Sequence, residues 1–448
     1  MKTSGRTKAV FLLAYPIVIA QLGTIIQGWA DTIMVGQYGT SELSAASFVN
    51  NIFNLSLYCL LGISYATTPI AGALCSQGKF CRLLRVFRES NVVNLLASII
   101  VVLLLLVLYC NIDHLGQPIE LLPLIRPYFI ALLISLPFLS LFNSMKQFFD
   151  ALGDTKTPMW TMVGSNILNI ILNYFLIFVL DLGLLGAGIA TLAARMSMPL
   201  LMYLAIVRGS LQKIFDFQQI KTHSQSLKLT WRGMASLLRL GIPISVQLSL
   251  ETCAFSISAI FMGWIGVTAL AAHQVMVTIS TLAFMVYYGI GAAAAIRMAH
   301  YRGINNWDEV RKTAAAAFKM SLAFGVIIVF VIYCAATPIA RLFTSSQEVA
   351  NLLLTFMPAF LCYQIGDCLQ ITYANALRSV ENVRPMMLFA FISFVLIGIP
   401  LAYFLAFTLG MGALGIWWSY PFCLTVAGLS YYLQFKKTVK TRMAHSIK

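Results

Sequence analysis

The chain has 448 residues, of which 60% are hydrophobic and only 10% are charged. A soluble globular protein carries about 25% charged residues, so this composition excludes a set of soluble domains and indicates a chain largely surrounded by lipid. The 30 Lys and Arg outnumber the 15 Asp and Glu, giving a formal net charge of +15, an excess that in a membrane protein marks cytoplasmic loops rather than nucleic-acid binding.

Long apolar runs recur along the whole chain. A helix needs about 20 apolar residues to cross a bilayer, and twelve segments satisfy this condition. The sequence therefore predicts an all-α polytopic membrane protein with spans at 10–37, 44–74, 90–110, 124–149, 158–180, 186–207, 238–262, 269–298, 314–336, 348–377, 385–406 and 412–434.

The positions of the basic residues predict the orientation. All but three of the 30 Lys and Arg fall at the chain ends, in alternate loops or near the span ends that adjoin those loops, the exceptions being Arg126, Arg195 and Arg341. Since cytoplasmic loops retain positive charge, both termini are expected in the cytoplasm.

The chain aligns with itself at an offset of 227 residues, and Gly and Pro dominate the matches. Each half has six spans, so both halves enter the membrane in the same orientation. This predicts two six-helix bundles related by a pseudo-twofold axis, as in secondary transporters: an N-terminal lobe 1–207, a cytoplasmic linker 208–237 and a C-terminal lobe 238–448. The matched pairs include Pro16 with Pro243, Gly62 with Gly289, and Gly183 with Gly410.

Three acidic residues lie inside spans: Asp31, Glu251 and Asp367. An ionised side chain at the bilayer centre costs about 3 kcal/mol or more, so each requires an explanation. Each has a polar residue one helical turn earlier, on the same face, which can orient the carboxylate or share a bound ion. These residues are Gln27, Gln247 and Tyr363, and the fifth span adds a stripe of Asn166, Asn169 and Asn173.

The acids have a structural and a functional interpretation. As structural groups they would pair with Arg195 or Arg297. The repeat, however, aligns them with Ser258, Thr24 and Ser140, so they break the symmetry of the halves, and we expect a functional role. Arg195 either faces the interior of its lobe or extends towards the cytoplasm, and Arg297 either extends likewise or responds to Glu251; the residues alone leave both open.

Carboxylates in such positions can bind coupling ions. A carboxyl group removed from water exchanges protons near neutral pH more readily. Two carboxylates with further oxygen atoms can instead hold sodium, a hard cation. We therefore expect coupling to Na⁺ or H⁺ and no other cofactor.

Several motifs resemble the multidrug and toxic compound extrusion (MATE) family, specifically its NorM-like branch. They are Asp31-Thr-Ile-Met-Val-Gly, Ala271-Ala-His-Gln-Val, Gly289-Ile-Gly-Ala-Ala-Ala-Ala-Ile-Arg297 and Tyr363-Gln-Ile-Gly-Asp367. The resemblance covers nearly the whole chain and implies two six-helix lobes forming a V with both termini inside.

The resemblance also implies roles for single residues. Asp31 looks like the family's amino-lobe carboxylate for proton coupling and drug release, with Asn169 and Asn173 as its hydrogen-bonding neighbours. Glu251 and Asp367, with Tyr363 nearby, look like the carboxy-lobe cation site of the NorM-like branch and are the candidate Na⁺ ligands. The DinF-like branch lacks this second pair.

Aromatic side chains could stack on a cationic drug. Phe284 and Tyr287 are the candidates retained for a substrate cavity, although such residues more often serve packing. The sequence has no Walker A motif for ATP-driven transport and no intramembrane nucleophile–base pair or His-rich metal motif, so an enzyme is not expected.

The sequence thus predicts a cation-coupled antiporter that exports amphipathic, cationic organic compounds or drugs. It would act in a bacterial inner membrane as a monomer, with lipid but not nucleic acid as a partner. A lipid-linked oligosaccharide flippase or polysaccharide exporter of a related fold is the alternative, disfavoured because it would need a cationic cavity. An intramembrane enzyme or receptor ranks third.

Overall fold

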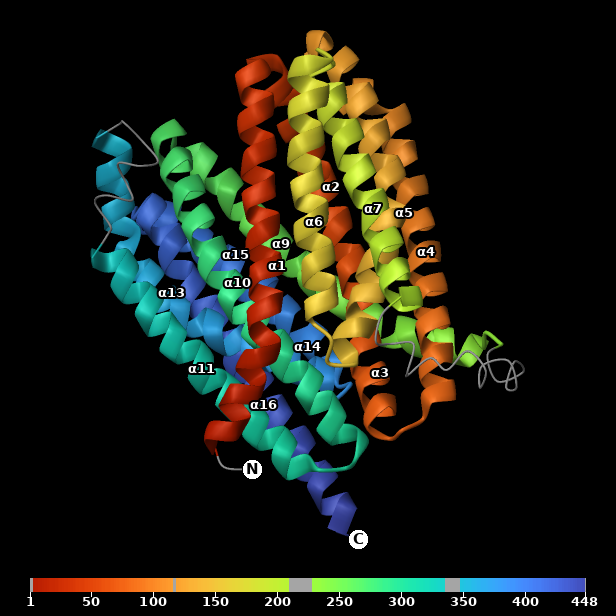
Figure 1. Ribbon diagram of the computed structural model, residues 1–448. Coiled ribbons are helices and arrows are strands. Elements are labelled where there is room, and N and C mark those ends of the chain that lie inside the picture. The colour runs from red at the N-terminus through yellow and green to blue at the C-terminus, as the bar shows by residue number, and fades with distance from the viewer. Residues whose placement is uncertain (1–2, 116–117, 209–227, 335–346, 448) are drawn as a thin grey trace. The chain divides into compact units, whose positions relative to one another are not determined.

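The structure, a computed structural model, describes residues 3–115, 118–208, 228–334 and 347–447 (Figure 1). Throughout these ranges the regular secondary structure is helical. Hydrocarbon offers no hydrogen bonds to the backbone, so a chain within it must satisfy its N–H and C=O groups internally, and a helix does so within each segment. Most of the predicted linker, residues 209–227, lies outside the described residues.

The prediction of an all-α fold with twelve long helices is confirmed. By length and composition, eleven helices in the described ranges are apolar enough to cross a membrane, and they coincide with the first eleven predicted spans. The twelfth predicted span lies in a helix of 35 residues that continues into the basic tail. The chain is thus a many-span membrane protein.

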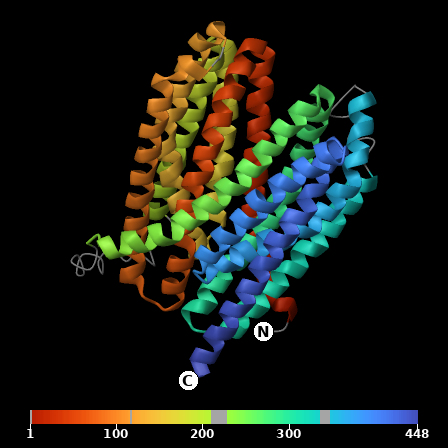
Figure 2. The same ribbon diagram turned by 180° about the vertical axis from the view of Figure 1, so that it is seen from behind.

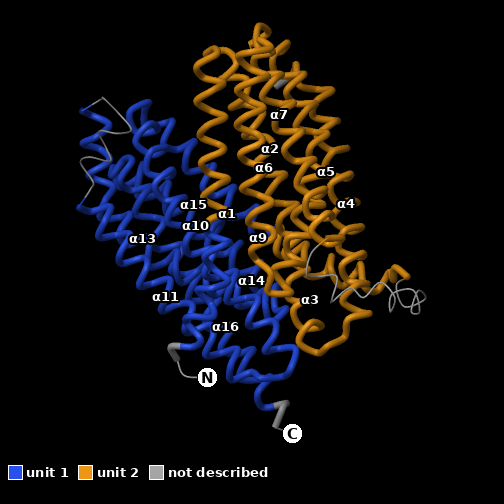
Figure 3. Tube along the Cα trace, viewed as in Figure 1, with its two compact units in different colours: residues 1–18, 246–448 blue, residues 19–245 orange. Residues whose placement is uncertain are grey.

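The chain divides into two compact units, coloured separately in Figure 3. Unit 2 comprises residues 19–245. It contains the later part of α1 (Thr3–Tyr38), then α2 (Thr40–Tyr65), α3 (Thr67–Ser76), α4 (Phe80–Cys110), η1 (Ile112–Leu115), η2 (Ile119–Leu121), α5 (Leu122–Ala151), α6 (Lys156–Tyr174), η3 (Phe175–Val179), α7 (Gly183–Arg208) and the start of α9 (Trp231–Ile265).

Unit 1 comprises residues 1–18 and 246–448. It contains the start of α1, the later part of α9, and then α10 (Val267–Gly303), α11 (Trp307–Cys334), α13 (Gln347–Ser379), α14 (Val383–Ala390), η6 (Phe391–Gly398), α15 (Ile399–Tyr403), η7 (Phe404–Thr408) and α16 (Ala413–Ile447). Residues 231–237, assigned to the linker from sequence, already belong to α9.

Each unit has an apolar interior and an apolar exterior. In unit 2, Phe53 of α2 packs edge-on against Phe129 of α5, with ring centroids 5.0 Å apart. In unit 1, the fully buried Trp417 of α16 packs against Phe356 and Phe360 of α13. Large apolar side chains also lie on the outside, as expected of a surface that faces lipid.

Two helices contribute to both units. Membership changes between residues 18 and 19 in α1 and between residues 245 and 246 in α9, which are equivalent positions under the 227-residue offset. Pro16 and Pro243, two residues before each change, remove one backbone hydrogen bond from each helix. Figure 2 shows α9, in green, as one continuous helix across this point.

We call α1 and α9 the crossing helices, because each belongs to both units. A glycine of a neighbouring helix contacts each of them where its membership passes from one unit to the other. A Cβ atom at Gly62 of α2 would lie 2.4 Å from the Cα of Ser245 in α9. A Cβ atom at Gly289 of α10 would lie 2.4 Å from a side-chain carbon of Val18 in α1. These two contacts are also related by the offset of 227. The sequence match between Gly62 and Gly289 therefore corresponds to the same close approach of two helices in each half.

Another matched pair requires glycine for its backbone angles. Gly183, which begins α7, has φ 52°, and Gly410, in the loop before α16, has φ 70°. Both lie in the left-handed region that side chains disfavour. The repeat read from Gly and Pro is therefore a repeat of backbone shape.

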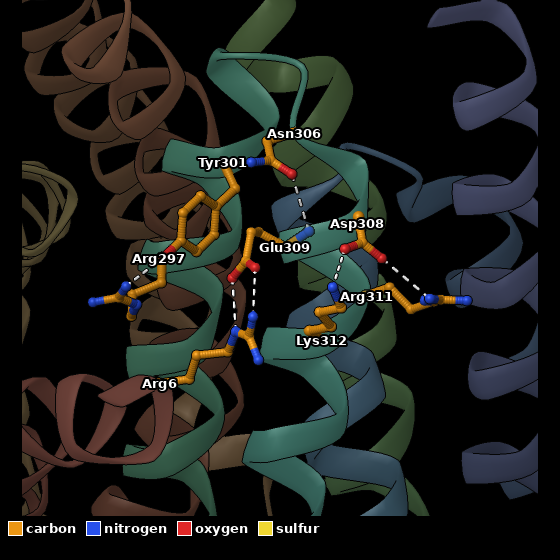
Figure 4. Close-up of polar contacts among 8 residues, drawn as sticks. All are labelled: Arg6, Arg297, Tyr301, Asn306, Asp308, Glu309, Arg311 and Lys312. Atoms are coloured by element: carbon orange, nitrogen blue, oxygen red, sulfur yellow. Dashed lines mark hydrogen bonds and ion pairs between the residues drawn. The ribbon is translucent and has the colours of Figure 1, made fainter. Parts of the chain in front are cut away.

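Glutamates fix the starting ends of both crossing helices. Arg6 of α1 donates from Nε and one terminal nitrogen to the carboxylate of Glu309 in α11, over 2.8 and 2.7 Å (Figure 4). Glu89 of α4, which is buried, accepts bonds from the backbone N–H and the hydroxyl of Thr230, over 2.9 and 2.7 Å. Thr230 in turn caps α9, so each crossing helix begins at a carboxylate of the unit in which it starts.

We expect Gly62→Ala to destabilise the protein by about 1–3 kcal/mol, because the added methyl group must push α9 away from α2. Gly164→Ala is the matched control, since a Cβ atom there would meet nothing within 4 Å. Thermal unfolding of the purified protein measures both changes. An unfolding temperature of Gly62→Ala at or above that of the wild type would contradict the close approach.

Glu309→Arg should lower the unfolding temperature because it places two guanidinium groups together, and adding Arg6→Glu should restore it. The side chains of Arg6 and Glu309 are only 13% and 16% exposed and lie in direct contact, so a favourable, non-zero coupling free energy is expected from a double-mutant cycle. Arg311→Gln, which removes an exposed pair with Asp308, should change stability by less than about 1 kcal/mol. Strictly additive effects of the two exchanges would disprove the pairing.

Candidate functional site

Unit 2 places Asp31 in a network of amide side chains. Gln27, one turn earlier on α1, donates to Asp31 Oδ2 over 2.8 Å and lies 3.0 Å from Asn169 Oδ1. Asn173 of α6 donates to Asp31 Oδ1 over 2.5 Å and to Asn169 Oδ1 over 3.2 Å. The structure thus brings together Asp31, Gln27, Asn169 and Asn173, the four residues of this lobe predicted to form a site.

The network follows from helical spacing. Residues four apart lie on one face of a helix, so Gln27 reaches Asp31 along α1, and Asn169 and Asn173 form a ladder along α6. Both asparagines are buried, while Asp31 is half-buried. The carboxylate therefore receives hydrogen bonds from neutral amides and remains accessible from one side.

A cavity of about 230 Å³ adjoins this network within unit 2. Gln27 and Asn169 are part of its wall, which combines polar and apolar side chains. Arg195 of α7 also lines it, donating to Ser135 Oγ of α5 over 2.8 Å and attracting the charge of Asp31 electrostatically. The remaining lining residues are Gln21, Thr24, Leu57, Leu60, Leu61, Leu139, Ser140, Phe142, Asn143, Met162, Asn166, Thr191, Ala194 and Met198.

Unit 1 places Glu251 in a second network. Gln247, one turn earlier on α9, donates to Glu251 Oε2 over 2.8 Å, as the spacing predicted. Gln370 of α13 donates to the same oxygen over 3.1 Å. Arg378, near the end of α13, donates to Gln247 Oε1 over 2.7 Å. A buried arginine is thereby linked to the carboxylate through one amide.

Asp367 lies close to this network on α13 and is only 1% exposed. Its charge repels that of Glu251, and Tyr363, one turn earlier, lies near both carboxylates. Among the described residues, Asp367 Oδ2 and Gln370 Oε1 are buried oxygen atoms with no hydrogen-bond partner. Unit 1 therefore brings together Glu251, Asp367 and Tyr363 beside two oxygens that can accept a cation.

Three further predicted site residues, Arg297, Phe284 and Tyr287, lie on α10. Arg297 donates to the hydroxyl of Tyr301 over 2.5 Å and lies over its ring, 5.4 Å from the centroid (Figure 4). Phe284 stacks on Tyr288. Tyr287 is fully buried and donates to Gln364 Oε1 over 2.9 Å. Arg297 and Phe284 have no described contact with either carboxylate network, whereas Tyr287 lies within electrostatic range of Asp367.

Sequence reasoning missed Gln370 and Arg378 and left Arg195 undecided. Arg378 was counted with the basic residues that mark cytoplasmic ends. Helical spacing from Asp367 could have identified both, because Gln370 and Arg378 lie three and eleven positions later and share its face of α13. Arg195 lines the cavity, so the structure decides its direction.

Comparison with known proteins identifies a family. The family model described as MatE matches residues 16–175 and 243–404, and that described as Lipid II flippase MurJ matches only residues 124–255. The "Probable multidrug resistance protein NorM" of Bradyrhizobium diazoefficiens is 30% identical over 90% of this chain and 88% of its own. The "Multidrug resistance protein MdtK" of Pectobacterium atrosepticum is 28% identical over 93% and 92%.

Solved structures share the fold. The Vibrio cholerae MATE transporter VcmN in its bent form superposes with a TM-score of 0.83 at 20% identity, covering 98% of both chains. The eukaryotic MATE transporter AtDTX14 gives a TM-score of 0.86 at 19% identity, covering 99% of both. The fold expected from the sequence resemblance is thus confirmed.

Asn173→Ala should destabilise the protein by about 1.5–3 kcal/mol, because it removes the amide that donates to the Asp31 carboxylate within a buried network. Asn111→Ala is the matched control, since that exposed side chain bonds only locally, to the Val107 carbonyl. Chemical or thermal unfolding of the two variants provides the comparison. Equal losses of stability in the two variants would show that the bond to Asp31 stabilises the protein no more than the local bond of Asn111.

Proposed function

The chain belongs to the MatE family, and on this premise we propose that it exports amphipathic organic cations in exchange for Na⁺ or H⁺. Relatives that match along nearly its whole length are named multidrug resistance proteins, which supports small-molecule drugs as the substrates. It is a drug-efflux antiporter and not an enzyme.

The observation that carries the coupling proposal is the pair of carboxylate networks. Asp31 in unit 2 and Glu251 in unit 1 each accept hydrogen bonds from at least two amides. Neutral donors hold a carboxylate in place without cancelling its charge, so an ion or a cationic substrate can still be attracted to it. Asp367 adds a second carboxylate in unit 1, with one oxygen unsatisfied among the described residues.

The two networks suit different ions. In unit 1, Asp367 Oδ2, Gln370 Oε1 and the Glu251 carboxylate supply oxygen ligands, the kind that hard cations such as Na⁺ prefer. In unit 2, Asp31 is a single carboxylate among amides, which suits the exchange of a proton. We therefore assign Na⁺ to Glu251 and Asp367, and H⁺ to Asp31.

Antiport requires that ion and drug favour different states of the protein. The ion binds the carboxylates in the outward-facing state and neutralises them, so a cationic drug loses its electrostatic partner and leaves. Release of the ion to the cytoplasm restores the negative charge and with it the affinity for drug. Each charge that crosses supplies about 2.3 kcal/mol per 100 mV of membrane potential.

The setting of this reaction follows from the charge distribution. The basic residues of the cytoplasmic loops and termini support an orientation with both termini in the cytoplasm. The bacterial relatives support placement in the inner membrane. We propose that the chain works as a monomer and has no nucleic-acid partner.

The alternative, a lipid-linked oligosaccharide flippase, has weaker support. The flippase model matches only residues 124–255, and the cavity of unit 2 contains one arginine, Arg195, whose charge is offset by Asp31. A cavity built for a pyrophosphate would need an excess of positive charge.

The test is ethidium efflux from liposomes that contain only this chain, with Na⁺ and H⁺ gradients imposed separately. We expect Glu251→Gln with Asp367→Asn to reduce sodium-driven efflux at least tenfold, and Asp31→Asn to reduce proton-driven efflux at least tenfold. Each carboxylate change removes the charge that its ion must neutralise.

Asp113→Asn is the matched control, because that carboxylate forms an exposed pair with Arg126 and should leave efflux unchanged. Gradient-driven efflux of equal rate from the wild type and from a variant with all three carboxylates replaced would refute the proposal. Loss of efflux in the control would instead indicate damage to the fold.

A further inference from the structure

Arg378 is a buried arginine in the region where unit 1 holds its two acids. The residue is 7% exposed and lies at the end of α13, eleven positions after Asp367. A guanidinium group removed from water is costly unless other charges compensate it. It donates a hydrogen bond to Gln247 Oε1 over 2.7 Å.

Gln247 connects the arginine to Glu251. Its amide oxygen accepts from Arg378, and its amide nitrogen donates to Glu251 Oε2 over 2.8 Å. The amide dipole therefore points its negative end at the guanidinium and its positive end at the carboxylate, so both contacts are favourable. The same oxygen of Glu251 also accepts from Gln370 over 3.1 Å, which fixes the carboxylate between α9 and α13.

The charges of this region sum to one negative. When both are ionised, Glu251 and Asp367 contribute two negative charges, and Arg378 contributes one positive charge. Arg297 of α10 is directed to Tyr301, and the groups of α16 that face Glu251 are Cys423 and Tyr431, both neutral in their protonated forms. With Arg378 balancing Glu251, the charge left over is that of Asp367, which lies three positions before Gln370 on α13; Gln370 Oε1, like Asp367 Oδ2, has no hydrogen-bond partner among the described residues.

We propose that Arg378 is a positioning residue for ion coupling: it balances Glu251 through the Gln247 amide, so that the site at Glu251, Asp367 and Gln370 presents one net negative charge, rather than two, to Na⁺. The inference rests on the proposed function, which places Na⁺ at these carboxylates. Arg378 keeps ion binding weak enough for release, because without it two uncompensated carboxylates would hold the ion.

The test is radioactive Na⁺ binding to the full-length protein in nanodiscs. The wild type should bind one Na⁺ per chain. Glu251→Gln makes the site neutral and should abolish saturable binding. Adding Arg378→Gln to that variant restores one net negative charge and should restore binding to within about threefold of the wild type. Rescue of this kind is the opposite of what a purely structural arginine would give.

Two single variants complete the set. Arg378→Lys keeps the charge and should bind Na⁺ within about threefold of the wild type. Arg378→Gln alone leaves two uncompensated carboxylates and should lower the half-saturating Na⁺ concentration at least tenfold. If this single variant fails to fold, the double variant still decides, because it does not bury the extra negative charge.

Failure to rescue binding in a folded Glu251→Gln, Arg378→Gln variant would overturn the inference, as would the absence of saturable Na⁺ binding to the wild type. Ethidium efflux from liposomes made with the same preparations separates this failure from failure of the proposed function. If the wild type exports ethidium but the Arg378 substitutions leave Na⁺ binding unchanged, the inference is wrong and the proposed function stands.

Discussion

The constraint on which this structure depends is that hydrocarbon satisfies no polar group. The backbone meets it by forming helices, which pair their own N–H and C=O groups. Carboxylates cannot do so alone and obtain donors from amides on neighbouring turns and helices, as Asp31 does from Gln27 and Asn173. Amides are suited to this task because they satisfy an anion without neutralising it. The charge that makes Asp31 and Glu251 expensive is thereby preserved for use.

The two halves share a backbone plan but differ in chemistry. Gly62 and Gly289 permit the same close approach to a crossing helix, and Gly183 and Gly410 adopt the same left-handed conformation. The acids, by contrast, occupy unmatched positions. Unit 2 surrounds a single carboxylate with amides beside a cavity that Arg195 lines, whereas unit 1 combines two carboxylates with Arg378. One duplicated scaffold thus supports two sites of different charge.

Much of this could be predicted from sequence, because helical periodicity and the cost of buried charge are local properties. The spans, the repeat and the contacts of Gln27 with Asp31 and of Gln247 with Glu251 follow from spacing along one helix. Arg378 could not be placed, since a long side chain at a helix end can extend to solvent or turn inward, and only the side-chain hydrogen bonds between α9 and α13 decide. The assignment of 1–18 to the later unit was equally inaccessible, because no local pattern reports a partner 303 residues away.

The crossing of α1 sets an order on biosynthesis. Residues 1–18 leave the ribosome before residues 19–245, yet they pack with residues 246–448, which are made later. Unit 2 is continuous in sequence and can close once Ser245 has been translated, but Arg6 has no Glu309 to meet until more than half of the chain exists. Contacts between such distant residues form late and slowly. The contact between α1 and Glu309 is therefore among the later ones to form, and a chain interrupted before α11 would lack it.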